Sequence, residues 1–240
     1  MKTCAIIIAA YNADKYILEC YNSVKNQIPI EGYSVEIRIG VDGCEKTADV
    51  LRRAGIPFYW SEKNVGAYTM RNSLMAIAPA DCYSIFDADD VMFPDYLKKI
   101  LNVMSKEIKL DYYYSEYPEC VMTAKINCNE NLKPIQGARI EYGGAITFSH
   151  KILDSLGGFY GVRVAADSDF MARIRLAEYN IHEIKEPLYY RRRHPNALTK
   201  KSDTGIGSPY RKEVWKKMTE ERERGIVKIV PQRIELYFTN

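Results

Sequence analysis

A cluster of carboxylates directly follows a hydrophobic run in the first half of the chain: residues 84–86 lead into Asp87, Ala88, Asp89 and Asp90. In open α/β sheets, ligands bind beyond the carboxyl ends of the strands, so a strand that ends here directs these acids into the binding crevice. Side chains two positions apart in an extended chain share a face, which predicts that Asp87 and Asp89 lie together. Such oxygens suit Mg²⁺ or Mn²⁺ shared with phosphate. The alternative is that the acids cap a following helix, a role that suits Asp90 best.

The elements that position this cluster alternate along the first half of the chain. Short apolar runs, typical of buried strands, alternate with segments whose apolar residues recur at helical spacing. This rhythm predicts an α/β fold with a mostly parallel, Rossmann-like sheet, helices on both faces and right-handed crossovers. The expected strands are 5–9, 35–41, 57–60 and 82–86, and the expected helices are 15–27, 48–54 and 67–78.

The rhythm changes in the second half, where β-rich runs crowd together and indicate a mixed or antiparallel extension of the sheet. After a helix at 94–105, the expected strands are 111–117, 121–126, 144–148 and 181–190, with a helix at 169–179.

The C-terminal region begins with Ser208 and Pro209, a good N-cap and N1 pair for a helix that runs to about Arg224. A β-like segment at 226–238 follows this helix. We therefore predict one main domain at 1–200, divided into halves at 1–110 and 111–200, and a helix-strand appendage at 201–240.

Composition excludes several classes of protein. The 240 residues are 47% hydrophobic and 27% charged, typical of an ordinary folded domain, and the net charge of +3 is too small to indicate a nucleic-acid partner. The six cysteines form no CxxC pair, which argues against a zinc site. The amino terminus resembles no signal peptide, and no apolar run reaches the length of a membrane span. We expect a reduced, cytoplasmic protein.

Positive charge is concentrated between Arg191 and Lys217, a segment that contains nine basic residues and two acidic ones. The expected C-terminal helix carries an apolar stripe of Tyr210, Val214, Trp215 and Met218. This combination predicts weak peripheral contact with an anionic membrane at its inner face, or a homo-oligomer interface. Packing of the stripe into the core is the alternative.

Four segments, in order, resemble the family 2 glycosyltransferases, which have the GT-A fold. The opening strand and turn at 6–12, the acidic turn at 40–44, the segment Asn64-Val65-Gly66 with Arg71-Asn72, and the metal motif at 87–90 match the family pattern. Each segment is weak by itself, but together, at plausible separations, they form a strong joint signal. The resemblance covers about residues 3–200.

The resemblance implies a site for a nucleoside-diphosphate sugar, with a UDP-sugar favoured. It places Ala10 and Tyr11 beside the base and Asp42 on the base or ribose. Tyr11 offers a ring for packing and Asp42 an acceptor. The alternatives are a tyrosine that covers the sheet edge and an aspartate in an Asp-Gly turn. The remaining donor-binding residues implied are Asn64, Arg71, Asp87, Ala88 and Asp89.

The resemblance also implies a catalytic base. The segments 143–146 and 157–159 are similar to the acceptor side of the family, and they lead to 166–170. The family pattern is Glu-Asp, and its Asp is the base. Ala166 replaces the Glu here, so the role falls on Asp167, which would take the proton of the acceptor hydroxyl. Asp169 is the competing carboxylate, although it could simply cap a helix.

The run Tyr190-Arg191-Arg192-Arg193-His194 resembles the strand end that carries Arg and His in the family. His194 would complete the metal shell or contact the diphosphate, and Arg191 or Arg193 would neutralise the leaving group. A basic surface patch is the alternative.

The resemblance therefore implies an inverting, single-displacement transfer of one sugar, dependent on Mn²⁺ or Mg²⁺, to a glycan or lipid-linked saccharide in polysaccharide biosynthesis. Processive members carry Gln-x-x-Arg-Trp and membrane helices, which this sequence lacks. A nucleotidyltransferase would need a glycine-rich loop where residues 9–12 stand. A non-catalytic module that docks on a partner transferase or membrane is the other alternative.

Overall fold

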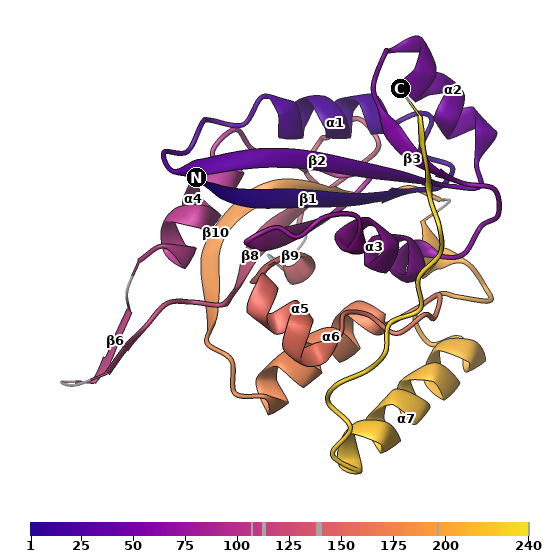
Figure 1. Ribbon diagram of the computed structural model, residues 1–240. Coiled ribbons are helices and arrows are strands. Elements are labelled where there is room, and N and C mark those ends of the chain that lie inside the picture. The colour runs from indigo at the N-terminus through magenta and orange to yellow at the C-terminus, as the bar shows by residue number, and fades with distance from the viewer. Residues whose placement is uncertain (107, 112–113, 138–140, 196, 240) are drawn as a thin grey trace.

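The computed structural model describes residues 1–106, 108–111, 114–137, 141–195 and 197–239. Within these residues, nine strands form one sheet in the order β11-β3-β2-β1-β4-β9-β8-β10-β5, the centre of the molecule in Figure 1. The strands of this sheet are β1 (Lys2–Ala10), β2 (Tyr33–Asp42), β3 (Phe58–Ser61), β4 (Cys82–Asp87), β5 (Val91–Met92), β8 (Cys120–Cys128), β9 (Glu141–Ser149), β10 (Ile181–Arg192) and β11 (Tyr237–Thr239).

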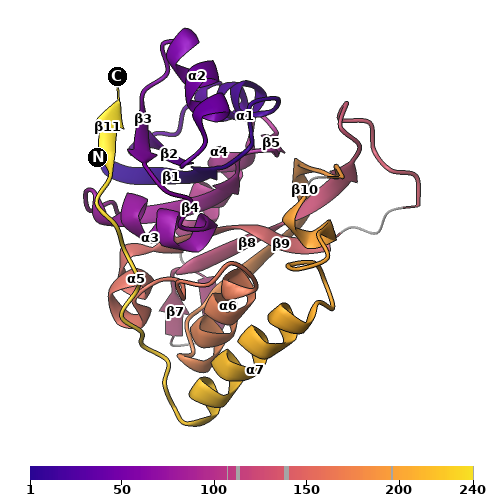
Figure 2. The same ribbon diagram turned by 90° about the vertical axis from the view of Figure 1, so that its right-hand side faces the viewer.

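Helices cover both faces of the sheet (Figures 1 and 2). Helices α1, α2 and α4 pack on one face, α3, α5 and α6 on the other, and α7 lies outside α6. The helices are α1 (Ile17–Lys25), α2 (Glu45–Arg53), α3 (Ala67–Ala76), α4 (Tyr96–Met104), α5 (His150–Leu156), α6 (Ala166–Leu176) and α7 (Pro209–Glu223), with a 3-10 turn η1 (Leu198–Lys200). Among the described helices, none is long and apolar enough to cross a membrane.

The parallel half of the sheet is built on β1, whose run Ile6-Ile7-Ile8 is fully buried because helices cover both of its faces. β1 pairs in parallel with β2 and β4, and β2 with β3. The second half is mixed: β9 runs antiparallel to β4 and β8, whereas β10 runs parallel to β8. The predicted fold class, a parallel sheet with a mixed extension, is confirmed.

A short hairpin of β6 (Ile108–Asp111) and β7 (Tyr114–Glu116) forms a separate two-stranded sheet and projects from one side of the molecule in Figure 1. The predicted strand at 111–117 falls partly on residues 112 and 113, which lie outside the described residues.

The apolar stripe of α7 is partly buried. Met218 is 2% exposed and packs with Val214 against the segment that precedes α6, including Val164. Tyr210 and Trp215 keep 38% and 39% of their surface exposed. Only Val214 and Met218 of the stripe therefore pack into the core. Contact of α7 with a membrane or with a second copy of the chain stays a prediction.

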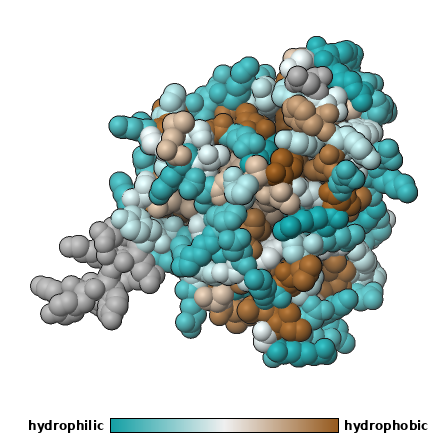
Figure 3. Space-filling model, viewed as in Figure 1, coloured by the Kyte–Doolittle hydropathy of each residue, from teal (hydrophilic) through white to brown (hydrophobic). Residues whose placement is uncertain are grey.

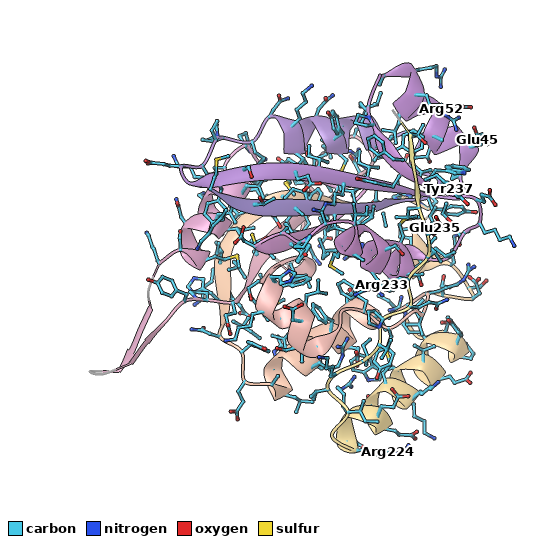
Figure 4. The ribbon with its side chains drawn as sticks, in the orientation of Figure 1. Glu45, Arg52, Arg224, Arg233, Glu235 and Tyr237 are labelled. Carbon is cyan, nitrogen blue, oxygen red and sulfur yellow. The ribbon has the colours of Figure 1, made fainter. Side chains whose placement is uncertain are left out.

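The chain returns from α7 to the sheet as an extended segment, residues 226–239, which we call the C-terminal strap (Figures 1 and 4). Ile229 N donates to Leu156 O at 3.1 Å, and Ile234 N donates to Ser73 Oγ at 2.9 Å. The strap thus crosses α5 and α3 before β11 pairs antiparallel with β3. Hydrophobic residues gather on the lower part of this face, toward α6 and α7, in Figure 3.

The predicted β-like segment at 226–238 forms a strand only at Tyr237–Thr239. The reason is that Pro231 lacks an N–H and that Ile229 N and Ile234 N donate to α5 and α3 and not to a neighbouring strand. The last part of the strap still alternates in burial as a strand does. Ile234 and Leu236 are half-buried, whereas Arg233, Glu235 and Tyr237 are exposed and lie along the strap in Figure 4.

Gly157 lies directly against the strap. It ends α5 with φ +81°, and a Cβ there would stand 1.9 Å from Ile229 O. Gly157→Ala should lower the free energy of unfolding by about 3 kcal/mol, since it adds a backbone clash to left-handed strain. Gly225 is a matched control, because it has the same φ and a Cβ added there would meet nothing within 4 Å. Gly225→Ala should cost about 1 kcal/mol. Equal losses in urea unfolding would contradict the packing of the strap.

Candidate active site

The site lies where parallel strands end together. β1 and β4 are in register, with Ala9 opposite Asp87, and Ala10 pairs with Val41 on β2. Ala10 is fully buried, so it can offer a ligand only its backbone, whereas the Tyr11 side chain is 49% exposed at this edge. The carboxyl ends of β1, β2 and β4 therefore bring the predicted donor-binding segments to one edge of the sheet.

Asp42 holds the loop that leads into α3. Its two carboxylate oxygens accept hydrogen bonds from Val65 N at 2.7 Å and Gly66 N at 2.9 Å, and the residue is 2% exposed. Burial raises the pKa of Asp42, although these N–H groups oppose the shift. Asn64 Nδ2 donates to Asp42 O at 3.3 Å. In this conformation Asp42 and Asn64 shape the loop, and their contact with a donor stays a prediction.

The carboxylates of the metal motif point to different partners. β4 ends at Asp87, and Asp90 N donates to Asp87 O at 3.2 Å, so the chain turns through Ala88 and Asp89. We predicted a shared face for Asp87 and Asp89 on the assumption that the chain is extended here. That assumption is wrong. Asp87 Oδ1 pairs with the guanidinium of Arg71.

Asp89 and Asp90 connect this turn to the end of β10. Asp89 Oδ2 lies 2.8 Å from His194 Nε2, and Asp90 Oδ1 accepts a hydrogen bond from Arg192 N at 2.9 Å. Burial, and then the charges of Asp89 and Asp87, raise the pKa of Asp90 well above its ordinary value. Asp90 is 4% exposed and therefore structural, but it bonds to the backbone of β10 and does not cap α4, so the helix-cap role that the sequence suggested for it is wrong.

The three arginines at the end of β10 differ in their surroundings. Arg192 is 4% exposed; its Nε donates to Asp89 O at 2.8 Å, and its guanidinium pairs with Glu19. Arg193 Nε donates to Asn127 Oδ1 at 2.9 Å. Arg191 is half-buried and acts electrostatically on Asp87. The buried Arg192 thus stabilises the turn at Asp87–Asp90, a role that the sequence did not indicate.

A divalent ion fits the donor set at Asp89 and His194. Metal–ligand bonds of about 2.1 Å at right angles place neighbouring ligands about 3.0 Å apart, close to the observed 2.8 Å between Asp89 Oδ2 and His194 Nε2. Among the described residues, no group of three or more His, Cys, Asp or Glu side chains could hold an ion. Such a pair of ligands suits an ion that takes its remaining ligands from phosphate and water.

Asp167 lies in the first turn of α6, and its charge contributes to raising the pKa of Asp87. It is half-exposed, and its Oδ1 accepts a hydrogen bond from Tyr68 Oη at 2.8 Å. Tyr68 and Arg71 lie one turn apart on α3, and Arg71 Cζ stands 5.3 Å from the centre of the Tyr68 ring. Helix α3 therefore connects the predicted base to the predicted metal motif. The sequence analysis did not identify Tyr68 as a site residue. The available signal was its position three residues before Arg71, which places both on the same face of a helix.

Asp169, the competing carboxylate, is fully buried between two arginines. Its Oδ2 accepts from Arg173 Nε at 2.8 Å, and its Oδ1 pairs with Arg222 of α7. Arg173, also fully buried, donates further to Leu156 O at 2.9 Å. Asp169 thus joins α6 to α7, and its burial keeps it from a substrate hydroxyl.

Asp169→Ala should lower the free energy of unfolding by about 3–5 kcal/mol, because it leaves the buried guanidinium of Arg173 without its counterion. Glu220→Ala is the control, since Glu220 makes an exposed pair with Lys216 and its loss should cost less than about 1 kcal/mol. Denaturant unfolding measures both. A small loss at Asp169, comparable with that at Glu220, would contradict a role in joining the helices.

Known glycosyltransferases match this chain in sequence. A family model described as "Glycosyl transferase family 2" matches residues 5–171. An uncharacterized glycosyltransferase of Methanocaldococcus jannaschii, MJ1057, is 26% identical over 117 residues, which is 46% of this chain and 40% of that protein. The chain thus spans well under half the length of this relative.

Solved structures share the fold. Staphylococcus aureus TarS 1–349 in complex with UDP superposes with a TM-score of 0.63 at 17% identity, over 81% of this chain and 61% of that one. The mannosyltransferase PcManGT from Pyrobaculum calidifontis, in complex with GDP-Man and Mn²⁺, gives a TM-score of 0.58 at 16% identity, over 92% and 61%.

Proposed function

Because the chain belongs to glycosyl transferase family 2, we propose that it transfers a single sugar from a nucleoside-diphosphate donor to an acceptor hydroxyl, with inversion. One observation carries the proposal: α3 bonds to Asp167 through Tyr68 and to Asp87 through Arg71. A carboxylate suited to proton transfer is thereby tied to the acidic turn at the sheet edge. Residues 1–110 would serve the donor and 111–200 the acceptor.

The donor would lie along the edge formed by β1, β2 and β4. The exposed ring of Tyr11 can pack on the base, and the loop held by Asp42 and Asn64 would line the ribose. A UDP-sugar is favoured, and TarS has been solved with UDP-GlcNAc. The GDP-Man complex of PcManGT makes a guanosine donor the alternative to test.

The diphosphate would lie at Asp89 and His194, which would hold Mn²⁺ or Mg²⁺. The ion would supply positive charge to the phosphate oxygens. Asp87, paired with Arg71, completes this acidic edge. Arg191 and Arg193, half-buried at the end of β10, would add positive charge as the diphosphate leaves.

Asp167 would act as the base. The acceptor oxygen forms a bond to the anomeric carbon, the bond from that carbon to the diphosphate oxygen breaks, and the acceptor proton passes to Asp167. Attack from the face opposite the leaving group inverts the anomeric centre. The acceptor would be a glycan or lipid-linked saccharide in polysaccharide biosynthesis.

Donor turnover tests the proposal without knowledge of the acceptor. The protein is incubated with UDP- and GDP-sugars in Mn²⁺, and release of the nucleoside diphosphate is measured as the sugar passes to water or to an added saccharide. Proton NMR of the new anomeric centre should show the opposite configuration to the donor. No turnover of any donor would favour a non-catalytic module, and a retained configuration would contradict single displacement.

A further inference from the structure

The hydroxyl of Tyr68 bonds α3 to Asp167, and it is well sheltered. Tyr68 lies in the first turn of α3 and is 8% exposed. Its oxygen donates to Asp167 Oδ1 at 2.8 Å, and its ring centre lies 5.6 Å from that of Phe159. Because the Tyr68 ring is held in place, its hydrogen bond fixes the direction in which the Asp167 carboxylate points.

The direction of this hydrogen bond follows from the surroundings of the phenol. Burial, and then the negative charge of Asp167, raise the pKa of Tyr68 well above its ordinary value. The hydroxyl therefore keeps its proton at neutral pH and acts as a donor. A carboxylate held through Oδ1 can present Oδ2 to a substrate.

The support for Tyr68 is itself fixed. Arg71 stacks over the Tyr68 ring and pairs with Asp87. The next residue, Asn72, donates from Nδ2 to Phe159 O at 2.8 Å and accepts from Phe159 N at 3.0 Å. Helix α3 is thus bonded to the segment that leads into α6, the helix that carries Asp167.

We infer that Tyr68 is a positioning residue, which holds the carboxylate of Asp167 in the orientation that accepts the acceptor proton. The inference rests on the proposed function, in which Asp167 is the base. It assigns to Tyr68 no contact with the donor. Loss of its hydroxyl should therefore affect proton transfer and leave donor binding unchanged.

The bond is tested first in the free protein, independently of activity. Tyr68→Phe removes one oxygen and keeps the ring. The ¹³C carboxyl resonance of Asp167, assigned by its loss in Asp167→Asn, should move in Tyr68→Phe. Tyr160→Phe is a matched control, because it removes a tyrosine bond to Glu221; there the resonance should stay in place. An unmoved resonance in folded Tyr68→Phe would overturn the inference.

Kinetics then separate positioning from packing. In Tyr68→Phe we expect kcat to fall about tenfold with the donor KM unchanged, because misplacement of a catalytic group slows the chemical step. Tyr160→Phe should keep the wild-type kcat. A rise in donor KM at unchanged kcat, or no change in either, would overturn the role.

A double-mutant cycle with Asp167→Asn completes the test. If Tyr68 acts through Asp167, Tyr68→Phe should cause no further loss in the Asp167→Asn background; an equal tenfold loss there would show that Tyr68 acts elsewhere. Should Tyr68→Phe not fold, Asp167→Glu displaces the carboxylate by one methylene, and unchanged kcat in that variant would overturn the inference. A wild type that turns over no donor, with the resonance still moving in Tyr68→Phe, would refute the proposed function and leave the bond in place.

Discussion

Asp167→Asn should lower kcat for sugar transfer by about 10²–10⁴-fold, the usual effect of removing a general base. Asparagine has nearly the same shape, and its oxygen can still accept the bond from Tyr68, but it cannot take a proton. In the proposed function Asp167 faces the acceptor, so the Kd for the nucleoside diphosphate should not change. Initial rates with the best donor, and calorimetry with its nucleoside diphosphate, measure the two quantities.

The matched control for this change is Asp154→Asn. Asp154 lies on α5, and its side chain is 68% exposed, so the variant should keep the wild-type kcat. Near-normal turnover by Asp167→Asn would show that another group takes the proton. The buried Asp169 is not suited to replace it, since both of its oxygens are occupied by arginines.

Asp89→Ala should abolish ion-dependent binding of the donor. Asp89 is one of the two side chains that we propose to hold the ion, so its removal should raise the Kd for UDP in Mn²⁺ by about 100-fold, the largest effect usual for groups around a metal. His194→Ala should act in the same direction. Titration calorimetry in Mn²⁺ and in EDTA gives the affinities.

Asp49→Ala controls for loss of negative charge alone. Asp49 lies on α2 in an exposed pair with Arg52, and its removal should leave the affinity for UDP unchanged. If the wild type binds UDP equally well in Mn²⁺ and in EDTA, no ion takes part in binding. If Asp89→Ala keeps full ion-dependent binding, the ion lies elsewhere.

The sequence predicted those parts of the site that depend on local pattern. A buried apolar run that stops at Asp87 identifies a strand end, because hydrophobic side chains cannot continue past the covered part of the sheet. The alternation of strands and helices predicts a parallel sheet, and the resemblance to the family places Tyr11 and Asp42 at the same end of it. Both inferences use residues that are close together along the chain.

The remaining parts depend on contacts between distant residues. Tyr68 and Asp167 are 99 positions apart, and Asp169 and Arg222 are 53 apart, so no local pattern could pair them. The turn after Asp87 was missed because a run of acids fits both an extended chain and a turn. The N–H groups of Val65 and Gly66, which donate to the Asp42 carboxylate, also belong to a loop more than twenty residues away.

We expect this edge of the sheet to bind a nucleoside diphosphate together with a divalent ion. The most direct measurement is the melting temperature of the wild type with UDP or GDP, each in Mn²⁺ and in EDTA. With one nucleotide at about 100 times its Kd, we expect a rise of about 5–10 °C in Mn²⁺ and little or none in EDTA. No rise with either nucleotide, or an equal rise in EDTA, would contradict the account.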